Sequence, residues 1–148
     1  MMSALTNFDI QRYVQQTHLP NFRGVFMRDT LPSGGPRQCE CGIVNLNTSQ
    51  QSGSHWVCYF KSDNDQHRRI YFDSFGQITP IEIQKYLKTK EEFDKKTGVI
   101  QRNTDIVQSI NSSVCGHLCL NVLDALTKGL SFQHTINILR QRFEDGHS

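Results

Sequence analysis

The first apolar pattern along the chain has the period of a helix. Ile10, Tyr13 and Val14 would lie on one face of it. Thr6 stands three residues ahead of Asp9, and this spacing is typical of a capping box at a helix start. We therefore expect a short amphipathic helix near the beginning of the chain.

Several segments rich in β-branched and aromatic residues predict strands. Polar or glycine-containing stretches separate them, and the segment from Leu31 to Pro36, with its prolines and glycines, must be a loop. We expect a central mixed or antiparallel sheet. The predicted strands are 22–26, 42–46, 55–60 and 69–75, with a further short strand at 98–101 after a charged, loop-like stretch at 89–96.

A helix in the second half of the chain is expected to be the buried centre of the fold. It should begin close to Cys115 and end at Gly129. One continuous apolar stripe runs along it, as is typical of a helix that packs on a sheet. The stripe consists of Cys115, Leu118, Cys119, Val122, Leu123 and Leu126.

Two further helices complete the predicted α+β fold. Thr79, Pro80 and Glu82 form a favourable helix start, with the proline in the first helical position and a capping box between Thr79 and Glu82. The last helix should follow a Ser131 cap and cover the sheet or the central helix. Its apolar face would consist of Phe132, Ile136, Leu139 and Phe143.

The composition indicates one globular domain over residues 1–148. The chain is 36% hydrophobic and 20% charged, and its 148 residues suit a single core. No apolar run approaches the roughly 20 residues that cross a bilayer, and residues 1–7 lack the pattern of a secretion signal. We therefore expect a soluble protein that is not secreted and has no membrane partner. We also expect it to be an intracellular monomer.

The charge distribution points weakly to nucleic acid. A net charge of +2 is too small to demand such a partner, and a local cluster of basic residues is usually a solvated face. We therefore expect at most weak DNA binding. The cluster consists of Lys85, Lys88, Lys90, Lys95, Lys96 and Arg102.

Five cysteines without the regular spacing of a disulfide framework suggest a reducing compartment or a thiol with a chemical task. Cys115 suits that task because a helix N-terminus stabilises a thiolate. The small polar residues Asn111, Ser112 and Ser113 before it and Gly116 after it would leave the sulfur reachable.

Other interpretations of the cysteines stay open. Cys115 also fits as a small core residue at a helix start. Packing accounts for Cys119 and Cys58, which lie within the helical stripe and a predicted strand. Cys39 and Cys41 could bind zinc together with Cys115, Cys119 or His117, but the two-residue spacer favoured by structural zinc sites is absent.

Three more residues have the chemistry that a thiol nucleophile needs. His55 heads a predicted strand and Asp73 ends the next one, so antiparallel pairing would bring a base and its orienting carboxylate together. The Gln108 amide could donate a hydrogen bond to a developing oxyanion. Taken singly, each has an ordinary explanation: a surface histidine, a turn carboxylate and a soluble glutamine.

Several motifs, spread over most of the chain, resemble those of the adenovirus maturation protease (adenain) family, which includes proteases of Polinton-type DNA transposons and related viruses. The order His, acid, Gln, Cys is a specific signal, which proteases that remove SUMO or ubiquitin share. The motifs are NFRGVF at 21–26, GIVN at 42–45, GSHW at 53–56, YFDSFG at 71–76, and Gln108 followed by Asn111, Ser112, Cys115 and Gly116.

The resemblance implies a cysteine endopeptidase in which Cys115 is the nucleophile, His55 the base, Asp73 its orienting acid and Gln108 an oxyanion donor. It also implies a central cysteine-bearing helix packed on a mixed sheet. The implied substrates are viral capsid or core precursor proteins cleaved near glycine pairs, in the host nucleus or the virion. No metal or cofactor is expected to be required.

Two departures from the family pattern affect these expectations. Asp73 stands where adenoviral enzymes have glutamate, and no cysteine in 88–107 could anchor an activating peptide by a disulfide. Stimulation by DNA or by a peptide would therefore have to act without that anchor. Two alternatives share the fold: a protease that removes SUMO or ubiquitin, and an inactive binding module.

Overall fold

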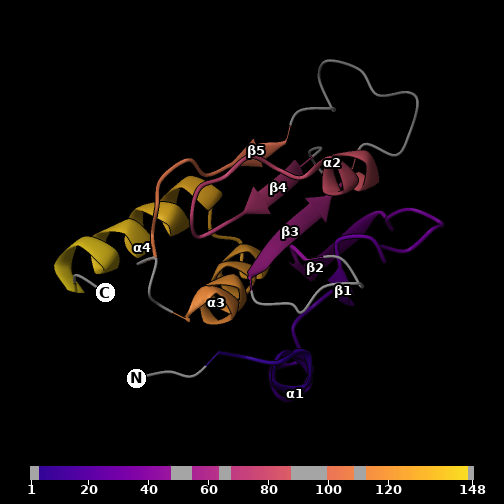
Figure 1. The fold of residues 1–148 in the computed structure, drawn as a ribbon, viewed down its shortest axis with the longest axis horizontal. Helices are drawn as coiled ribbons and strands as arrows, with labels where there is room; N and C mark the ends of the chain where they lie inside the picture. The colour runs from indigo at the N-terminus through magenta and orange to yellow at the C-terminus, as the bar shows by residue number, and fades with distance from the viewer. Residues whose placement is uncertain (1–3, 48–54, 64–67, 88–99, 109–112, 147–148) are drawn as a thin grey trace.

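A five-stranded mixed sheet forms the centre of the computed structural model, which describes residues 4–47, 55–63, 68–87, 100–108 and 113–146 (Figure 1). The strand order is β1-β2-β3-β4-β5; the outer pairs β1·β2 and β4·β5 are parallel, and the inner pairs are antiparallel. The elements are α1 (Asn7–Thr17), β1 (Phe22–Met27), β2 (Cys39–Asn45), β3 (Trp56–Ser62), β4 (Arg68–Phe72), α2 (Ile81–Leu87), β5 (Gln101–Arg102), α3 (Cys115–Thr127) and α4 (Phe132–Gly146).

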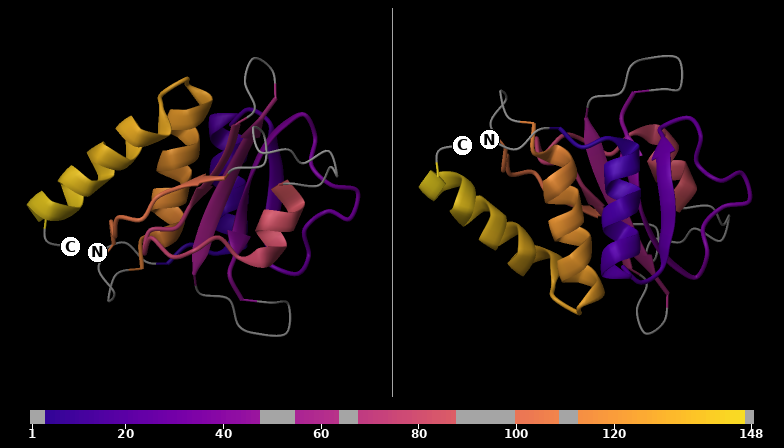
Figure 2. Two further views of the ribbon diagram at one scale, coloured as in Figure 1. Left: turned by 90° about the horizontal axis from the view of Figure 1, so that it is seen from above. Right: turned by 90° about the horizontal axis from the view of Figure 1, so that it is seen from below.

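Helices cover both faces of the sheet, with α3 and α2 on opposite sides (Figure 2). Side chains that alternate along each strand divide into two apolar clusters, as the pleat requires. On β3, Trp56 and Cys58 pack in the cluster that also includes α1, α3 and α4. Val57 and Tyr59 pack in the second cluster, with α2. The predicted α+β fold with a buried central helix is confirmed.

Local signals located most helix ends correctly. The Thr6 hydroxyl accepts a hydrogen bond from the Asp9 N–H, and the Asp9 carboxylate accepts one from the Thr6 N–H. The Ser131 hydroxyl caps α4 by accepting from the His134 N–H. No helix in the described segments is long and apolar enough to cross a membrane.

Two local predictions were wrong. The strand predicted at 69–75 ends at Phe72, because the Asp73 carboxylate accepts a hydrogen bond from the Phe75 N–H and turns the chain. The expected capping box at Thr79 is absent, since its buried hydroxyl makes no hydrogen bond within the described residues and α2 begins at Ile81.

Some predictions lie outside the described residues. They are the charged stretch 89–96 with its lysines, the beginning of the strand predicted at 98–101, the residues Gly53 and Ser54, and the polar residues Asn111 and Ser112. The loop predicted at 31–36 contains neither helix nor strand.

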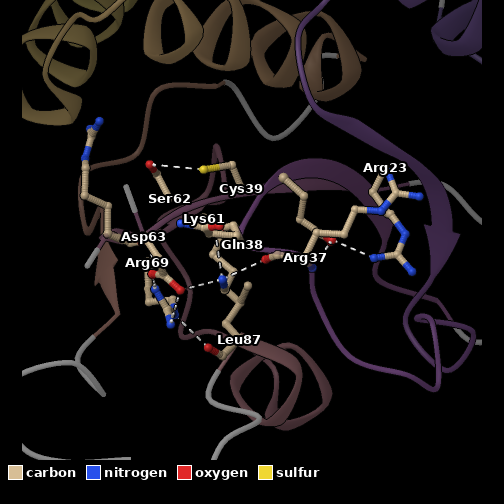
Figure 3. Close-up of polar contacts among 11 residues, drawn as sticks. Arg23, Arg37, Gln38, Cys39, Lys61, Ser62, Asp63, Arg69 and Leu87 are labelled. Carbon is tan, nitrogen blue, oxygen red and sulfur yellow. Dashed lines mark hydrogen bonds and ion pairs between the residues drawn. The ribbon is translucent and has the colours of Figure 1, made fainter. Parts of the chain in front are cut away.

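A polar network closes the end of the sheet where β3 leads into β4 (Figure 3). The buried Lys61 ammonium donates to the Arg37 and Gln38 carbonyls, at 2.7 and 3.0 Å, and to the Asp63 carboxylate at 2.7 Å. Arg69 also bonds with Asp63 and donates to the Leu87 carbonyl at the end of α2. These contacts hold one end of the β3–β4 pair, while His55 and Asp73 lie at the other end.

Candidate active site

Cys115 is the first residue of α3, as the sequence predicts. Its side chain is buried against β3, and the Trp56 backbone N–H donates to Sγ across 3.4 Å. The helix approaches the strand closely because Gly116 has no side chain: a Cβ there would lie 3.2 Å from the Trp56 ring. One turn later, the Cys119 thiol donates to the Trp56 carbonyl at 3.5 Å, so Cys119 and Cys58 serve packing as predicted.

His55 directly precedes β3 and reaches the end of β4. Its Nε2 lies 2.7 Å from Oδ1 of Asp73, whose side chain is almost fully buried. The Phe75 ring stacks on the imidazole, with centroids 4.8 Å apart and an interplanar angle of 23°. The imidazole is therefore held between a carboxylate and an aromatic face, and it interacts with the Cys115 sulfur as well.

The contacts of His55 and Cys115 change the pKa of both side chains in opposite directions. Burial alone would lower the pKa of His55, but hydrogen bonds to Asp73 and Cys115 outweigh it and raise that pKa to about 9. Burial alone would raise the pKa of Cys115. The hydrogen bonds from His55, the Trp56 N–H and the Gly116 N–H outweigh burial and lower it. Both shifts favour a thiolate beside an imidazolium.

Asp73 is fixed by its backbone as well as by its side chain. Asn103, which is also buried, accepts from the Asp73 N–H at 3.1 Å and donates to the Asp73 carbonyl at 2.7 Å. Oδ1 accepts from the Phe75 N–H at 2.9 Å in addition to its contact with His55. The carboxylate therefore has little freedom to leave the imidazole.

Gln108 joins the same end of the sheet through Ser74. Both side chains are buried, and the Ser74 hydroxyl donates to Oε1 of Gln108. The Ser74 carbonyl accepts from the Val107 N–H at 2.8 Å. The structure thus connects Cys115, His55 and Asp73 in one series of contacts and holds Gln108 against the residue that follows Asp73.

Sequence analysis missed three residues that organise this site: Asn103, Ser74 and Phe75. Each of the two polar residues acts through a hydrogen bond to a partner at least 30 positions away, so local patterns could not identify it. Phe75 was assigned to a strand, although the turn after Asp73 places its ring on His55. The Asp73 to Gly76 spacing was the available signal for that turn.

The zinc alternative finds no site in the part of the chain that the structure describes, where no three His, Cys, Asp or Glu side chains are grouped to hold a metal. The Cys39 sulfur lies 3.7 Å from the Ser62 hydroxyl, and the Cys41 thiol donates to the Pro20 carbonyl. Both side chains belong to β2, away from the start of α3.

Comparisons with known protein sequences find similarity to adenovirus proteases. The adenovirus endoprotease family model matches residues 22–142. A protease of Bovine adenovirus 2 is 25% identical over 132 residues, which cover 84% of this chain and 60% of that protein. The chain therefore spans less than two thirds of this relative.

The same fold occurs in crystal structures of the ASFV pS273R protease. One has a TM-score of 0.61 and 19% identity and covers 95% of this chain and 66% of that chain. The selenomethionine form has a TM-score of 0.59 and 18% identity with the same coverage.

Proposed function

The chain belongs to the adenovirus endoprotease family, and on this premise we propose that it is a cysteine endopeptidase whose nucleophile is Cys115. The observation that supports this most strongly is the series of contacts from Asp73 through His55 to Cys115, with 2.7 Å between Asp73 Oδ1 and His55 Nε2. A nucleophile, a base and a group that orients the base are what acyl transfer by a thiol requires.

The first half of the proposed reaction forms an acyl-enzyme. The Cys115 thiolate attacks the scissile carbonyl carbon, a C–S bond forms, and the carbonyl electrons move to oxygen. The Gln108 amide and the Cys115 backbone N–H at the start of α3 would donate to this oxyanion. When the intermediate collapses, the C–N bond breaks and the His55 imidazolium gives its proton to the leaving amine.

The second half restores the enzyme. His55, now neutral, takes a proton from water as the water attacks the thioester carbon, and the C–S bond breaks to release the acid and the thiolate. Asp73 holds the imidazole in position through both halves. The chain's own residues fill every role, so the proposal requires no cofactor.

We extend the proposal to the substrates that the family assignment favours: viral capsid or core precursor proteins, cleaved near glycine pairs in the host nucleus or the virion. The similarity to a bovine adenovirus protease supports this viral setting. Stimulation by DNA or a peptide activator stays a prediction, to be tested by adding each to the cleavage reaction.

Mass spectrometry of cleavage products tests the proposed function. Wild type and Cys115→Ala are incubated with glycine-rich precursor polypeptides, and Cys39→Ala serves as the matched control because Cys39 lies on β2. We expect products with wild type and Cys39→Ala and none with Cys115→Ala. Products in the Cys115→Ala sample, or none with wild type, would count against the proposal, and the latter would favour an inactive binding module.

A second assay separates precursor cleavage from removal of SUMO or ubiquitin. Each modifier is prepared with a C-terminal electrophile and mixed with the enzyme, and adducts on Cys115 are followed over time. Rapid adduct formation would favour the deconjugating alternative. The precursor proposal predicts adducts no faster than those with an unrelated electrophile of equal reactivity.

A further inference from the structure

We propose that Ser74 is a positioning residue that orients the Gln108 amide, so that the consecutive residues Asp73 and Ser74 align the base and the oxyanion donor together. This inference rests on the proposed function. Ser74 is completely buried, and its hydroxyl donates to Oε1 of Gln108.

The hydrogen bond determines which end of the amide faces away from Ser74. A glutamine amide has one acceptor oxygen and one donor NH₂ group, and rotation about its last torsion exchanges their places at little cost. Because the Ser74 hydroxyl donates to the oxygen, the NH₂ group is held at the opposite end. An amide flipped the other way would direct a partly negative oxygen at the oxyanion instead of a donor.

The backbone supports the same arrangement. The Ser74 carbonyl accepts from the Val107 N–H at 2.8 Å, so the turn and the segment before Gln108 are joined by a main-chain and a side-chain hydrogen bond. Burial makes an unpaired amide oxygen at this position costly. Gln108 itself is only 3% exposed, so water has little access to replace the serine hydroxyl.

Asp73, the residue before Ser74, positions the proposed base His55. Asp73 Oδ1 contacts His55 Nε2, and Asn103 fixes the Asp73 backbone with hydrogen bonds of 3.1 and 2.7 Å. Two successive side chains on one clamped turn therefore point to different partners, Asp73 to His55 and Ser74 to Gln108. The turn couples the geometry of the two functions.

The test compares Ser74→Ala with wild type in two reactions that differ in their need for an oxyanion donor. Peptide cleavage and inhibition by a peptide aldehyde both place negative charge on a carbonyl oxygen, whereas alkylation of Cys115 by iodoacetamide does not. We expect kcat to fall about tenfold to a hundredfold, with little change in KM. Aldehyde affinity should weaken by a similar factor, and the alkylation rate and its pH profile should stay unchanged.

Two further variants separate positioning from general structural damage. Ser74→Thr keeps the hydroxyl and should recover most of the lost activity. Ser74→Ala in a Gln108→Ala background should have almost no additional effect, because the amide that Ser74 orients is already missing. Thermal unfolding of each variant shows whether it is folded, and aldehyde binding supplies a readout for a variant that is folded but slow.

Three results would overturn the inference: an unchanged kcat and aldehyde affinity in Ser74→Ala, an equal loss in alkylation rate, or additive losses in the double variant. These differ from failure of the proposed function, which would appear as a wild-type chain that cleaves nothing. Even then the aldehyde comparison would test the role of Ser74, because it needs only addition of the thiolate to a carbonyl.

Discussion

The thiols of Cys115 and Cys119, one helical turn apart, have pKa values shifted in opposite directions because their surroundings differ. Cys119 is fully buried among apolar groups, and burial raises its pKa far above that of a free thiol. Cys115 is also buried, yet His55 and two backbone N–H groups lower its pKa. The position of Cys115 at the start of α3, beside an imidazole, accounts for the difference.

The raised pKa of His55 has a definite pH consequence. A pKa near 9 means that the imidazolium persists above the usual range of histidine, so its stabilising contribution is fully present below pH 6.5 and is lost as pH rises through about 9. In the proposed reaction, His55 gives this proton to the leaving amine. Activity should therefore decline on the alkaline side as His55 deprotonates.

Asp73→Asn tests this dependence at the residue scale. The substitution keeps an acceptor oxygen but removes the negative charge that stabilises the imidazolium, so the pKa of His55 should fall and the alkaline limb of kcat/KM should move to lower pH. We expect kcat to decrease by about a hundredfold or more. Rate profiles against pH measure both effects, and Asp145→Asn on the exposed end of α4 is the charge-matched control. An unmoved alkaline limb would show that Asp73 does not set the state of His55.

At the scale of elements, the turn after β4 is the structure that carries most of the site. The backbone φ angle of Gly76 is +67°, and its N–H donates to the Asp73 carbonyl at 2.7 Å. A Cβ there would lie 2.5 Å from the Thr104 carbonyl oxygen. The turn therefore needs glycine for its backbone conformation and for its close approach to the neighbouring segment.

Gly76→Ala should destabilise the fold by about 1 to 3 kcal/mol through backbone strain alone, with more from the contact with Thr104. Displacement of the turn should also lower kcat in the folded fraction. Urea unfolding and steady-state kinetics measure the two effects. Gly129→Ala isolates the strain, since Gly129 has φ +94 and open space around it. Equal losses in the two variants would mean that the Thr104 contact contributes nothing.

Elements whose signals are local could be predicted from sequence. The reciprocal cap between Thr6 and Asp9 and the start of α3 at Cys115 both depend on residues a few positions apart. The end of β4 was placed three residues too late, because the aromatic Phe75 favoured a longer strand, whereas the Asp73 carboxylate bonds the Phe75 N–H and turns the chain after Phe72. Thr79 failed as a cap for a related reason, since tertiary packing buried its hydroxyl.

In the candidate site, too, some residues could be recognised from local sequence and others only from contacts made by folding. His55, Asp73 and Cys115 could be proposed from residue type and position, and the structure brings them together. Ser74 and Asn103 act across the fold on Gln108 and Asp73, through pairs that only the folded chain creates. Their catalytic context therefore could not be predicted from neighbouring residues.

At the scale of the whole molecule, a buried carboxylate ties together the face of the sheet opposite Cys115. Glu40 Oε2 accepts from the Tyr59 and Tyr86 hydroxyls, and Oε1 accepts from Arg23 at 2.7 Å. The backbone N–H of Arg37 donates to Oε1 as well, at 2.8 Å. The network thereby connects β1, β2, β3 and α2.

Glu40→Gln should therefore destabilise the whole fold by about 2 to 3 kcal/mol, because it leaves Arg23 and the tyrosine hydroxyls poorly paired. Burial would raise the pKa of Glu40, but its hydrogen bonds outweigh this and lower it. The wild-type network therefore stabilises the fold fully at pH values above the ordinary pKa of a glutamate. This stabilisation is lost as the pH falls through the lowered pKa of Glu40. Denaturant unfolding at neutral and acidic pH measures the difference.

The control for Glu40→Gln is Glu144→Gln on the exposed side of α4, which should leave stability nearly unchanged. The folded Glu40→Gln enzyme should keep its kcat, because the network lies on the α2 face of the sheet and Cys115 packs on the other. A large fall in kcat without a loss of stability would contradict this separation.

Alkylation of individual cysteines by iodoacetamide tests whether folding pairs a Cys115 thiolate with the His55 imidazolium. Rates are measured by mass spectrometry from about pH 5 to about pH 9, for the native chain, the denatured chain and His55→Ala. We expect the alkylation rate of native Cys115 to have its pH midpoint below the usual thiol pKa of about 8.5, and His55→Ala to raise that midpoint. If native Cys115 reacts no faster than the denatured thiol at neutral pH, the proposed thiolate–imidazolium pair is contradicted.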